Sequence, residues 1–235
     1  MNLAAIDSCS PILSVAISAG NDIHCQETDA GMKHNELVMD YIDSLMKKAA
    51  LKPSDLDGVL CMGGPGSFTG LRIGYSAAKG LALSLSIPFI PIPTLECIAY
   101  QKKENSVVLA VLEARKKSFF YAFFKNNERL SGDADAGCVQ IEDEIENYLD
   151  SNLKTIYLTG YGSSLLYDSM HEDKKTWIEP DNKKKGYAKE LIAIARNKNL
   201  FSNYNKAANS EAFRAFLYSG PEYIRETDAQ IALKN

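Results

Sequence analysis

The chain lacks the groupings of residues that most metal-dependent catalytic sites need. It has three histidines in 235 residues. None is spaced as in H-x-x-x-H or H-E-x-x-H, the helical arrangements that bring two imidazoles to one metal ion. His34 stands beside Asn35 and Glu36, a poor chelate at the start of a helix. We therefore expect no metal site, and we expect His34 to cap a helix or to lie at the surface.

The sequence also lacks the signs of a secreted or membrane-bound protein. Its five cysteines include no C-x-x-C pair, and an odd number without a framework is typical of a reducing compartment. No apolar run approaches the roughly 18 residues of a membrane span. The N-terminus has no basic region and reaches Asp7 too early for a signal peptide. These absences predict a cytoplasmic protein with no membrane contact.

An excess of positive charge is missing as well. The formal net charge is −4, which argues against a general electrostatic attraction to nucleic acid. A local basic patch around Lys183–Lys185 is still conceivable and would bind tRNA directly. A solvated surface is the favoured interpretation of such a run.

The most distinctive run present is residues 63–74, Gly-Gly-Pro-Gly-Ser-Phe-Thr-Gly-Leu-Arg-Ile-Gly. It looks like a phosphate-binding loop, but a dinucleotide fingerprint that starts at Gly64 needs glycine where Thr69 stands. A P-loop needs a lysine after its last glycine, and none follows here. A G-x-S-x-G nucleophile elbow also fails, because Gly66 directly precedes Ser67. The run, called the glycine-rich loop below, matches none of these motifs.

Asp7 is the best carboxylate candidate for phosphate chemistry. It ends the first predicted strand and precedes Ser8-Cys9-Ser10, where hydroxyls and amides could line a phosphate pocket. A turn aspartate that bonds its own backbone is an equally good interpretation. We therefore take Asp7, Ser8, Gly64 and Gly66 as candidates for a vestigial phosphate loop and predict no catalytic residue, because one carboxylate without partners does not make a phosphotransferase.

The order of predicted elements indicates an α/β protein of two lobes. Residues 3–27 form three strands joined by turns, which predicts an antiparallel meander. Alternating helices and strands follow, and a second, shorter version of the same order begins with a hairpin formed by 106–112 and 119–124. We place the first lobe at 1–104 and a smaller second lobe at 105–205, and we expect the tail 206–235 to return to the first lobe.

The helix after the glycine-rich loop has a face of very small side chains. Gly70, Gly74, Ala78 and Ala82 recur every four residues. A glycine inside a helix costs about 1 kcal/mol relative to alanine, so we expect this face to gain from close packing. Packing on the chain's own sheet and packing on a helix of another subunit remain equally open.

Together these segments resemble the TsaB family, also called YeaZ, of the pathway that makes threonylcarbamoyladenosine in tRNA. The glycine-rich loop looks like the family's hallmark. The supporting matches, in the family's order, are Ala5-Ile6-Asp7, His34-Asn35-Glu36-Leu37, Pro93-Thr94-Leu95, Ala114-Arg115 and Pro221-Glu222-Tyr223-Ile224-Arg225. Ser8, Asn35 and Glu113 stand where the family usually has Thr, Ser and Asp, and residues 131–205 match only loosely.

The resemblance implies an actin-like (ASKHA) fold of two lobes, the second reduced, and a scaffold and activator that is not an enzyme. It implies pairing with TsaD and with the ATPase TsaE, so that TsaD can modify N6 of the adenosine at position 37 of tRNA. The chain alone would form a homodimer, would reach tRNA only through the complex, and would bind no cofactor tightly, with ATP only at the partner complex. A small actin-like ATPase or phosphotransferase that uses Asp7 is the main alternative, and a glycoprotease-like peptidase is less favoured.

The resemblance also implies that helices of the first lobe contact the partner. We place six residues at or beneath that interface: Gly70, Arg72, Gly74, Ala78, Tyr41 and Leu45. Interfaces of this kind bury roughly 1,200–2,000 Å². On this placement Gly74→Leu should weaken TsaD binding while the monomer stays folded.

Overall fold

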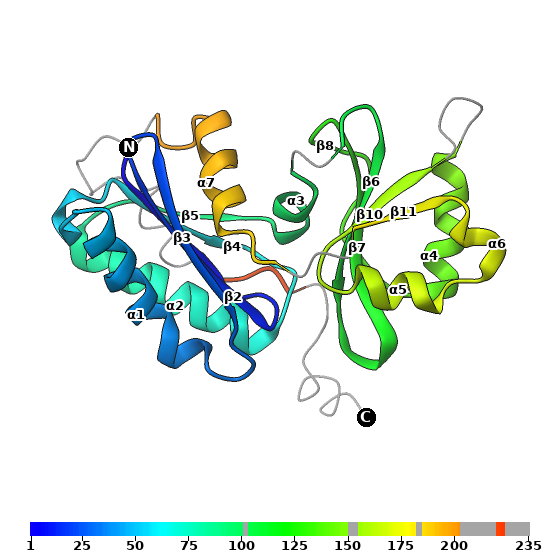
Figure 1. The fold of residues 1–235 in the computed structure, drawn as a ribbon, viewed down its shortest axis with the longest axis horizontal. Helices are drawn as coiled ribbons and strands as arrows, with labels where there is room; N and C mark the ends of the chain where they lie inside the picture. Colours follow the sequence, from blue (N-terminus) through cyan, green and yellow to red (C-terminus); the bar gives the residue numbers. More distant parts are fainter. Residues whose placement is uncertain (101–102, 150–154, 182–184, 203–219, 224–235) are drawn as a thin grey trace.

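The computed structural model describes residues 1–100, 103–149, 155–181, 185–202 and 220–223. Within these ranges the chain forms two lobes, each built around one mixed β-sheet (Figure 1). Lys183 and Lys184 of the basic run Lys183–Lys185, and most of the tail 206–235, fall outside the described residues. None of the helices in the described ranges combines the length and apolar character that a membrane span requires.

The sheet of the first lobe has the strand order β3-β2-β1-β4-β5. Strands β1 (Leu3–Asp7), β2 (Ile12–Ala19) and β3 (Asp22–Asp29) form the predicted antiparallel meander. Strands β4 (Gly58–Met62) and β5 (Phe89–Ile92) then join β1 in parallel. Every residue of β1 and β4 is buried, as expected for central strands that are covered on both faces.

Helices α1 (His34–Lys48) and α2 (Phe68–Leu85) lie side by side on one face of this sheet (Figure 1). A short 3-10 turn at Pro53–Asp55 separates α1 from β4. The apolar residues of α1 recur at helical spacing, and Val38, Ile42 and Leu45 are buried against the sheet. Ser67 caps α2 by accepting a hydrogen bond from the backbone N–H of Gly70 at 3.2 Å.

The sheet of the second lobe repeats the same connectivity. Strands β6 (Val107–Glu113) and β7 (Ser118–Lys125) form the predicted hairpin around the 3-10 turn Arg115–Lys117. Strands β8 (Glu128–Arg129) and β9 (Ala134–Gly137) both pair with β7. Strands β10 (Ile156–Thr159) and β11 (Ile178–Pro180) then add in parallel beyond β6. The meander followed by parallel strands therefore occurs twice, as predicted.

The sequence does not indicate β8 and β9, because residues 128–138 are mostly polar and resemble a loop. The two strands are short and their residues are not buried, so they carry no alternation of buried and exposed side chains to detect. Their pairing with β7 comes from the fold around them. Helices α4 (Cys138–Ile145), α5 (Ser163–Ser169) and α6 (Glu172–Lys175), with a 3-10 turn at Glu146–Tyr148, complete this lobe.

Two helices cross from one lobe to the other. Helix α3 (Thr94–Ala99) follows the first sheet but packs against β6 and β7, and α7 (Ala188–Asn197) follows the second sheet but packs against β1, β2 and β4. The two helices also contact each other, and Figure 1 shows α3 near the middle of the molecule and α7 (orange) over the first lobe. The largest buried cluster therefore joins both sheets.

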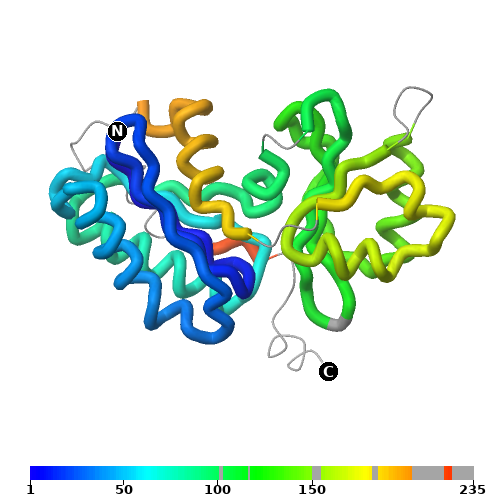
Figure 2. The backbone as a smooth tube through the Cα atoms, in the orientation of Figure 1, coloured from blue at the N-terminus to red at the C-terminus, as the bar shows by residue number. Residues whose placement is uncertain are grey.

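The limits 1–104 and 105–205 stay a prediction, but α7 lies within the range assigned to the second lobe and packs on the first sheet. The physical reason is its apolar face, since Leu191, Ile192 and Ala195 are buried in the cluster that joins the lobes. Sequence order alone does not show which of two sheets such a face covers. Figure 2 shows that the described tail segment 220–223 (orange-red) also lies near the junction of the lobes.

Candidate functional site

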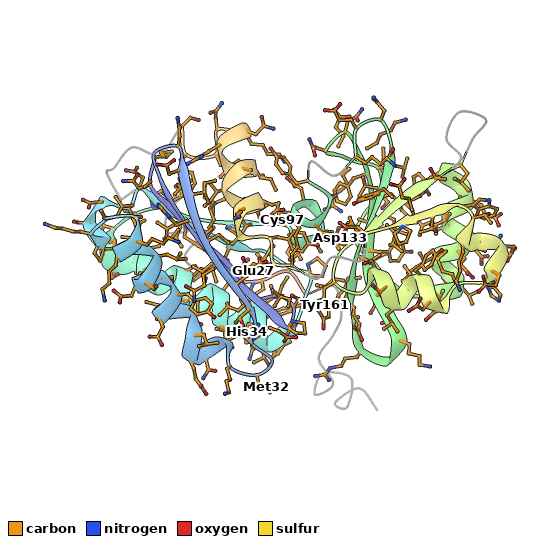
Figure 3. All side chains as sticks on the ribbon, viewed as in Figure 1. Glu27, Met32, His34, Cys97, Asp133 and Tyr161 are labelled. Carbon is orange, nitrogen blue, oxygen red and sulfur yellow. The ribbon has the colours of Figure 1, made fainter. Side chains whose placement is uncertain are left out.

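A cleft of about 810 Å³ lies between the two lobes, and it is called the interlobe cleft below. On the first lobe it is lined by the turn after β1, the start of α1 and the glycine-rich loop. On the second lobe it is lined by Glu113, Arg115 and Tyr161. Figure 3 shows Tyr161 beside the junction, with His34 and Met32 on the side of the first lobe. The cleft therefore lies where β1, β4, β6 and β10 end, the usual position for ligand sites in α/β sheets.

Asp7 ends β1 but is fully buried and does not line the cleft. Its carboxylate accepts hydrogen bonds from the Cys9 backbone N–H at 3.2 Å, the Cys9 thiol at 3.1 Å and the Tyr187 backbone N–H at 2.9 Å. Burial raises the pKa of Asp7 above its ordinary value, against the smaller opposing effect of these bonds. Tyr187 directly precedes α7, so Asp7 ties the start of α7 to the end of β1. The prediction of a turn aspartate that bonds its own backbone describes the bond to the Cys9 N–H. Nothing in the sequence indicated the bond to Tyr187.

Ser8 joins the turn after β1 to α2. Its hydroxyl donates to the carbonyl oxygen of Gly70 at 2.8 Å and is buried. A Cβ atom on Gly70 would lie 1.9 Å from the Ser8 carbonyl oxygen, and one on Gly74 would lie 2.5 Å from the Ser8 hydroxyl oxygen. Ser8 therefore contacts the small-residue face of α2 and is not turned toward a ligand.

Several backbone N–H groups of the glycine-rich loop are engaged within the chain. Four of them donate to acceptors on neighbouring elements or on the loop itself. The pairs are Gly63 to the Ile92 oxygen at 2.6 Å, Gly64 to the Thr94 hydroxyl at 3.2 Å, Ser67 to the Cys9 oxygen at 2.9 Å, and Gly70 to the Ser67 hydroxyl at 3.2 Å. A phosphate-binding nest requires several free N–H groups that point at the anion. The first part of the loop, Gly63 and Gly64, therefore offers a phosphate no free N–H group.

The glycines of the loop allow other parts of the chain to approach closely. Gly64 has a φ of 110° and a Cβ there would lie 2.3 Å from the carbonyl oxygen of Glu222. A Cβ on Gly66 would lie 2.8 Å from the Cβ of Cys9. Gly64 needs glycine both for packing and for its backbone conformation, and Gly66 needs it for packing. The vestigial-loop candidates Asp7, Ser8, Gly64 and Gly66 are thus close together in the fold, but their contacts are internal.

The small-residue face of α2 packs on the chain's own sheet. Gly70, Gly74 and Ala78 are buried, as is Leu45 of α1, and Ala78 belongs to the same cluster as the buried residues of β1 and β4. Of the six residues placed at a partner interface, only Arg72 is exposed and Tyr41 half-buried. Gly70, Gly74 and Ala78 therefore lie beneath the outer surface of α2, and a partner at that surface stays a prediction. The expectation for Gly74→Leu also changes, because the added side chain would disturb the monomer at Ser8.

Sequence reasoning misjudged His34. It is the first residue of α1, but it is buried, and its ring Nε2 lies 2.9 Å from the carbonyl oxygen of Ser10. Lys33 precedes the helix without a side-chain cap. The expectation of a capping or surface histidine is therefore wrong, because the turn after β1 folds over the start of α1. Among the described residues, no group of three or more His, Cys, Asp or Glu side chains is arranged to hold a metal ion.

The contact between the C-terminal segment and the glycine-rich loop was also missed, although the sequence singled out both. Glu222 donates its backbone N–H to the Gly63 carbonyl oxygen at 2.8 Å, and Tyr223 lies against Phe68. The described part of the tail thus contacts the first lobe. The sequence shows the two motifs only as separate segments far apart in the chain. That they touch can be seen only in the tertiary structure.

Comparisons with known proteins agree on one family. The family model described as "TsaD: tRNA N6-adenosine threonylcarbamoyltransferase" matches residues 12–233. The chain is 28% identical over 131 residues to the tRNA threonylcarbamoyladenosine biosynthesis protein TsaB of Escherichia coli K12, covering 54% of this chain and 57% of that protein. It is 27% identical over 222 residues to TsaB of Buchnera aphidicola subsp. Acyrthosiphon pisum, covering 92% of this chain and 97% of that protein.

Solved structures agree with the fold. YeaZ from Pseudomonas aeruginosa superposes with a TM-score of 0.69 at 19% identity, covering 85% of this chain and 93% of that one. A protein described as similar to the peptidase YeaZ from Pseudomonas aeruginosa gives a TM-score of 0.72 at 19% identity, covering 95% and 99%. Together with the repeated strand order, these likenesses confirm the predicted α/β fold of two actin-like lobes.

Proposed function

The chain belongs to the TsaD family and, within it, to the TsaB (YeaZ) group, and on this premise we propose that it serves in threonylcarbamoyladenosine formation as a scaffold and activator without catalytic activity of its own. It forms a heterodimer with TsaD and a complex with the ATPase TsaE, so that TsaD can modify N6 of the adenosine at position 37 of tRNA. The chain works in the cytoplasm, dimerises when alone, and reaches tRNA through the complex. It binds no cofactor tightly, and ATP acts at the partner complex.

The burial of Asp7 is the observation that carries the proposal of a non-catalytic role. An actin-like phosphotransferase needs an accessible carboxylate beside free backbone N–H groups at the phosphates. Here Asp7 is buried beneath the start of α7, and four N–H groups of the loop bond within the chain. These contacts favour a structural role over ATP turnover.

Reconstitution tests this function. Transfer RNA modification by TsaD and TsaE should depend on this chain, with at least a tenfold loss of product when it is omitted. The purified chain alone should not hydrolyse ATP above the background of an Asp7→Asn variant. Modification at full rate without the chain would contradict the proposed role, and ATP turnover that Asp7→Asn removes would identify an enzyme instead.

The partner surface is proposed on the outer side of α1 and α2. Arg72 and Tyr41 supply contacts there, while Gly70, Gly74, Ala78 and Leu45 lie beneath as packing residues. Met39 on α1 and Leu83 on α2 are large apolar side chains that are exposed on these two helices. Apolar side chains of this kind supply the buried centre of an interface.

Met39→Asp should weaken binding of TsaD by tenfold or more, because it introduces a charge into the apolar part of the proposed surface. Leu130→Asp is the matched control: Leu130 is 44% exposed against 46% for Met39, but it lies just after β8 on the second lobe. Titration calorimetry with TsaD measures both variants, and circular dichroism confirms that each is folded. Equal affinities for the two variants would show that the surface lies elsewhere.

A further inference from the structure

The described C-terminal residues Gly220–Tyr223 lie along the glycine-rich loop. The contact joins residues that are about 160 positions apart in the chain. The backbone N–H of Glu222 donates to the carbonyl oxygen of Gly63 at 2.8 Å. Glu222 and Tyr223 both line the interlobe cleft together with the loop. This segment, called the strap below, therefore forms part of the wall of the cleft.

The loop is shaped to accept a peptide backbone. The carbonyl oxygen of Glu222 passes where a Cβ atom of residue 64 would stand, 2.3 Å from that position. Gly64 also holds a φ of 110°, a conformation that other residues rarely adopt. The Gly63 carbonyl oxygen accepts the N–H of a passing peptide residue. The missing side chain at Gly64 leaves room for the carbonyl group of that same residue. Both features are complementary to an extended peptide.

An aromatic clamp holds the other end of the strap. The Tyr223 ring lies 5.0 Å from the Phe68 ring, and the Arg72 guanidinium lies 3.9 Å from the centre of the Phe68 ring. The Arg72 Nε donates to the Tyr223 hydroxyl at 3.4 Å. Tyr223 is nonetheless 43% exposed. One backbone hydrogen bond, one long side-chain hydrogen bond and one ring contact at an exposed edge make a weak attachment of the kind that opens locally.

The part of the loop under the strap presents an acceptor and no free donor. The Gly63 carbonyl oxygen faces the strap, and the N–H groups of Gly63 and Gly64 already donate to Ile92 and Thr94. The cleft beside it carries charges of both signs, because Glu113, Glu222 and Arg115 line it. A passing peptide N–H therefore fits this part of the loop better than a phosphate does.

We propose that the glycine-rich loop, with Phe68 and Arg72, is a binding site for an extended peptide that carries an aromatic residue, and that its resident ligand is the chain's own Gly220–Tyr223. The strap closes the site in cis. The site becomes available to the same peptide in trans when the strap leaves it. This inference does not depend on the proposed function, because it rests only on contacts within the chain.

A labelled peptide tests the site in the full-length chain. The probe is fluorescein-Gly-Pro-Glu-Tyr-Ile-Arg, the sequence of residues 220–225, and fluorescence anisotropy measures its binding. Tyr223→Ala removes the ring that holds the strap, so this variant should bind the probe at least tenfold more tightly than the unaltered chain, in which the strap competes. Tyr223→Phe keeps the ring contact and loses only the long hydrogen bond from Arg72, so it should bind the probe far more weakly than Tyr223→Ala does.

Three further arms decide the chemistry. A probe with alanine in place of tyrosine should not bind to the Tyr223→Ala variant. ATP should not displace the tyrosine probe from that variant. Gly64→Ala added to Tyr223→Ala should abolish binding of the probe, because the new Cβ atom occupies the path of the peptide backbone. If Gly64→Ala prevents folding, the comparison of Tyr223→Ala with Tyr223→Phe and the result with the alanine probe still test the proposal. Equal binding by Tyr223→Ala and Tyr223→Phe, binding of the alanine probe, or displacement by ATP would overturn the proposal.

Discussion

Asp7→Ala is expected to lower the free energy of unfolding by about 2–4 kcal/mol. The change leaves the buried backbone N–H groups of Cys9 and Tyr187 without their acceptor. Each buried donor left without a partner costs about 1–3 kcal/mol. Removal of the buried carboxylate returns part of this, because its burial is unfavourable to the charged form. The loss of two acceptor contacts outweighs that gain, and urea denaturation measures the difference.

Asp22→Ala is the control, because Asp22 is exposed at the start of β3, and it should change stability by less than about 0.5 kcal/mol. A result for Asp7→Ala within that same range would show that the carboxylate does not hold the start of α7.

The pH dependence gives a second measurement of the same carboxylate. Because burial raises the pKa of Asp7 above its ordinary value of 3.8, the folded chain keeps this proton to a higher pH than the unfolded chain does. Stability contributed by Asp7 is therefore lost as pH rises from 3.8 through the folded pKa. Asp7→Asn cannot titrate, so its stability should lack this loss over the same window.

Gly70→Ala should destabilise the chain by about 3 kcal/mol, although alanine is the better helix former by about 1 kcal/mol. The new Cβ would lie 1.9 Å from the Ser8 carbonyl oxygen, a backbone atom that moves only if the turn after β1 or the start of α2 moves. Such a shift also strains the bond from the Ser8 hydroxyl to the Gly70 oxygen. Overpacking against backbone therefore outweighs the gain in helix propensity.

Gly80→Ala is the matched control in the same helix. Gly80 is exposed, and a Cβ there would meet nothing within 4 Å. This variant should stabilise the chain by about 0.5–1 kcal/mol through helix propensity alone. Urea midpoints at unchanged slope measure both variants. Stabilisation by both would mean that α2 does not pack on Ser8 as the structure has it.

Local patterns in the sequence were sufficient for most of the longer elements and for their order. The alternation of β2, the apolar stripe of α1 and the apolar hairpin of β6 and β7 each depend on neighbouring residues, so the pattern predicts them directly. The repeat of a meander followed by parallel strands also followed from order alone. The short strands β8, which is exposed, and β9, which is half-buried, have no such pattern, and the sequence gives no sign of them.

The glycine-rich loop shows what the sequence by itself determined and what only the tertiary structure decided. Its spacing excluded the known nucleotide motifs, and glycine at these positions indicated that something approaches closely. A glycine, however, records only that space is needed and not what fills it. The fold decided that Ser8, Cys9 and Glu222 fill it, because contacts between residues far apart in the chain form only when β1, α2 and the strap are brought together.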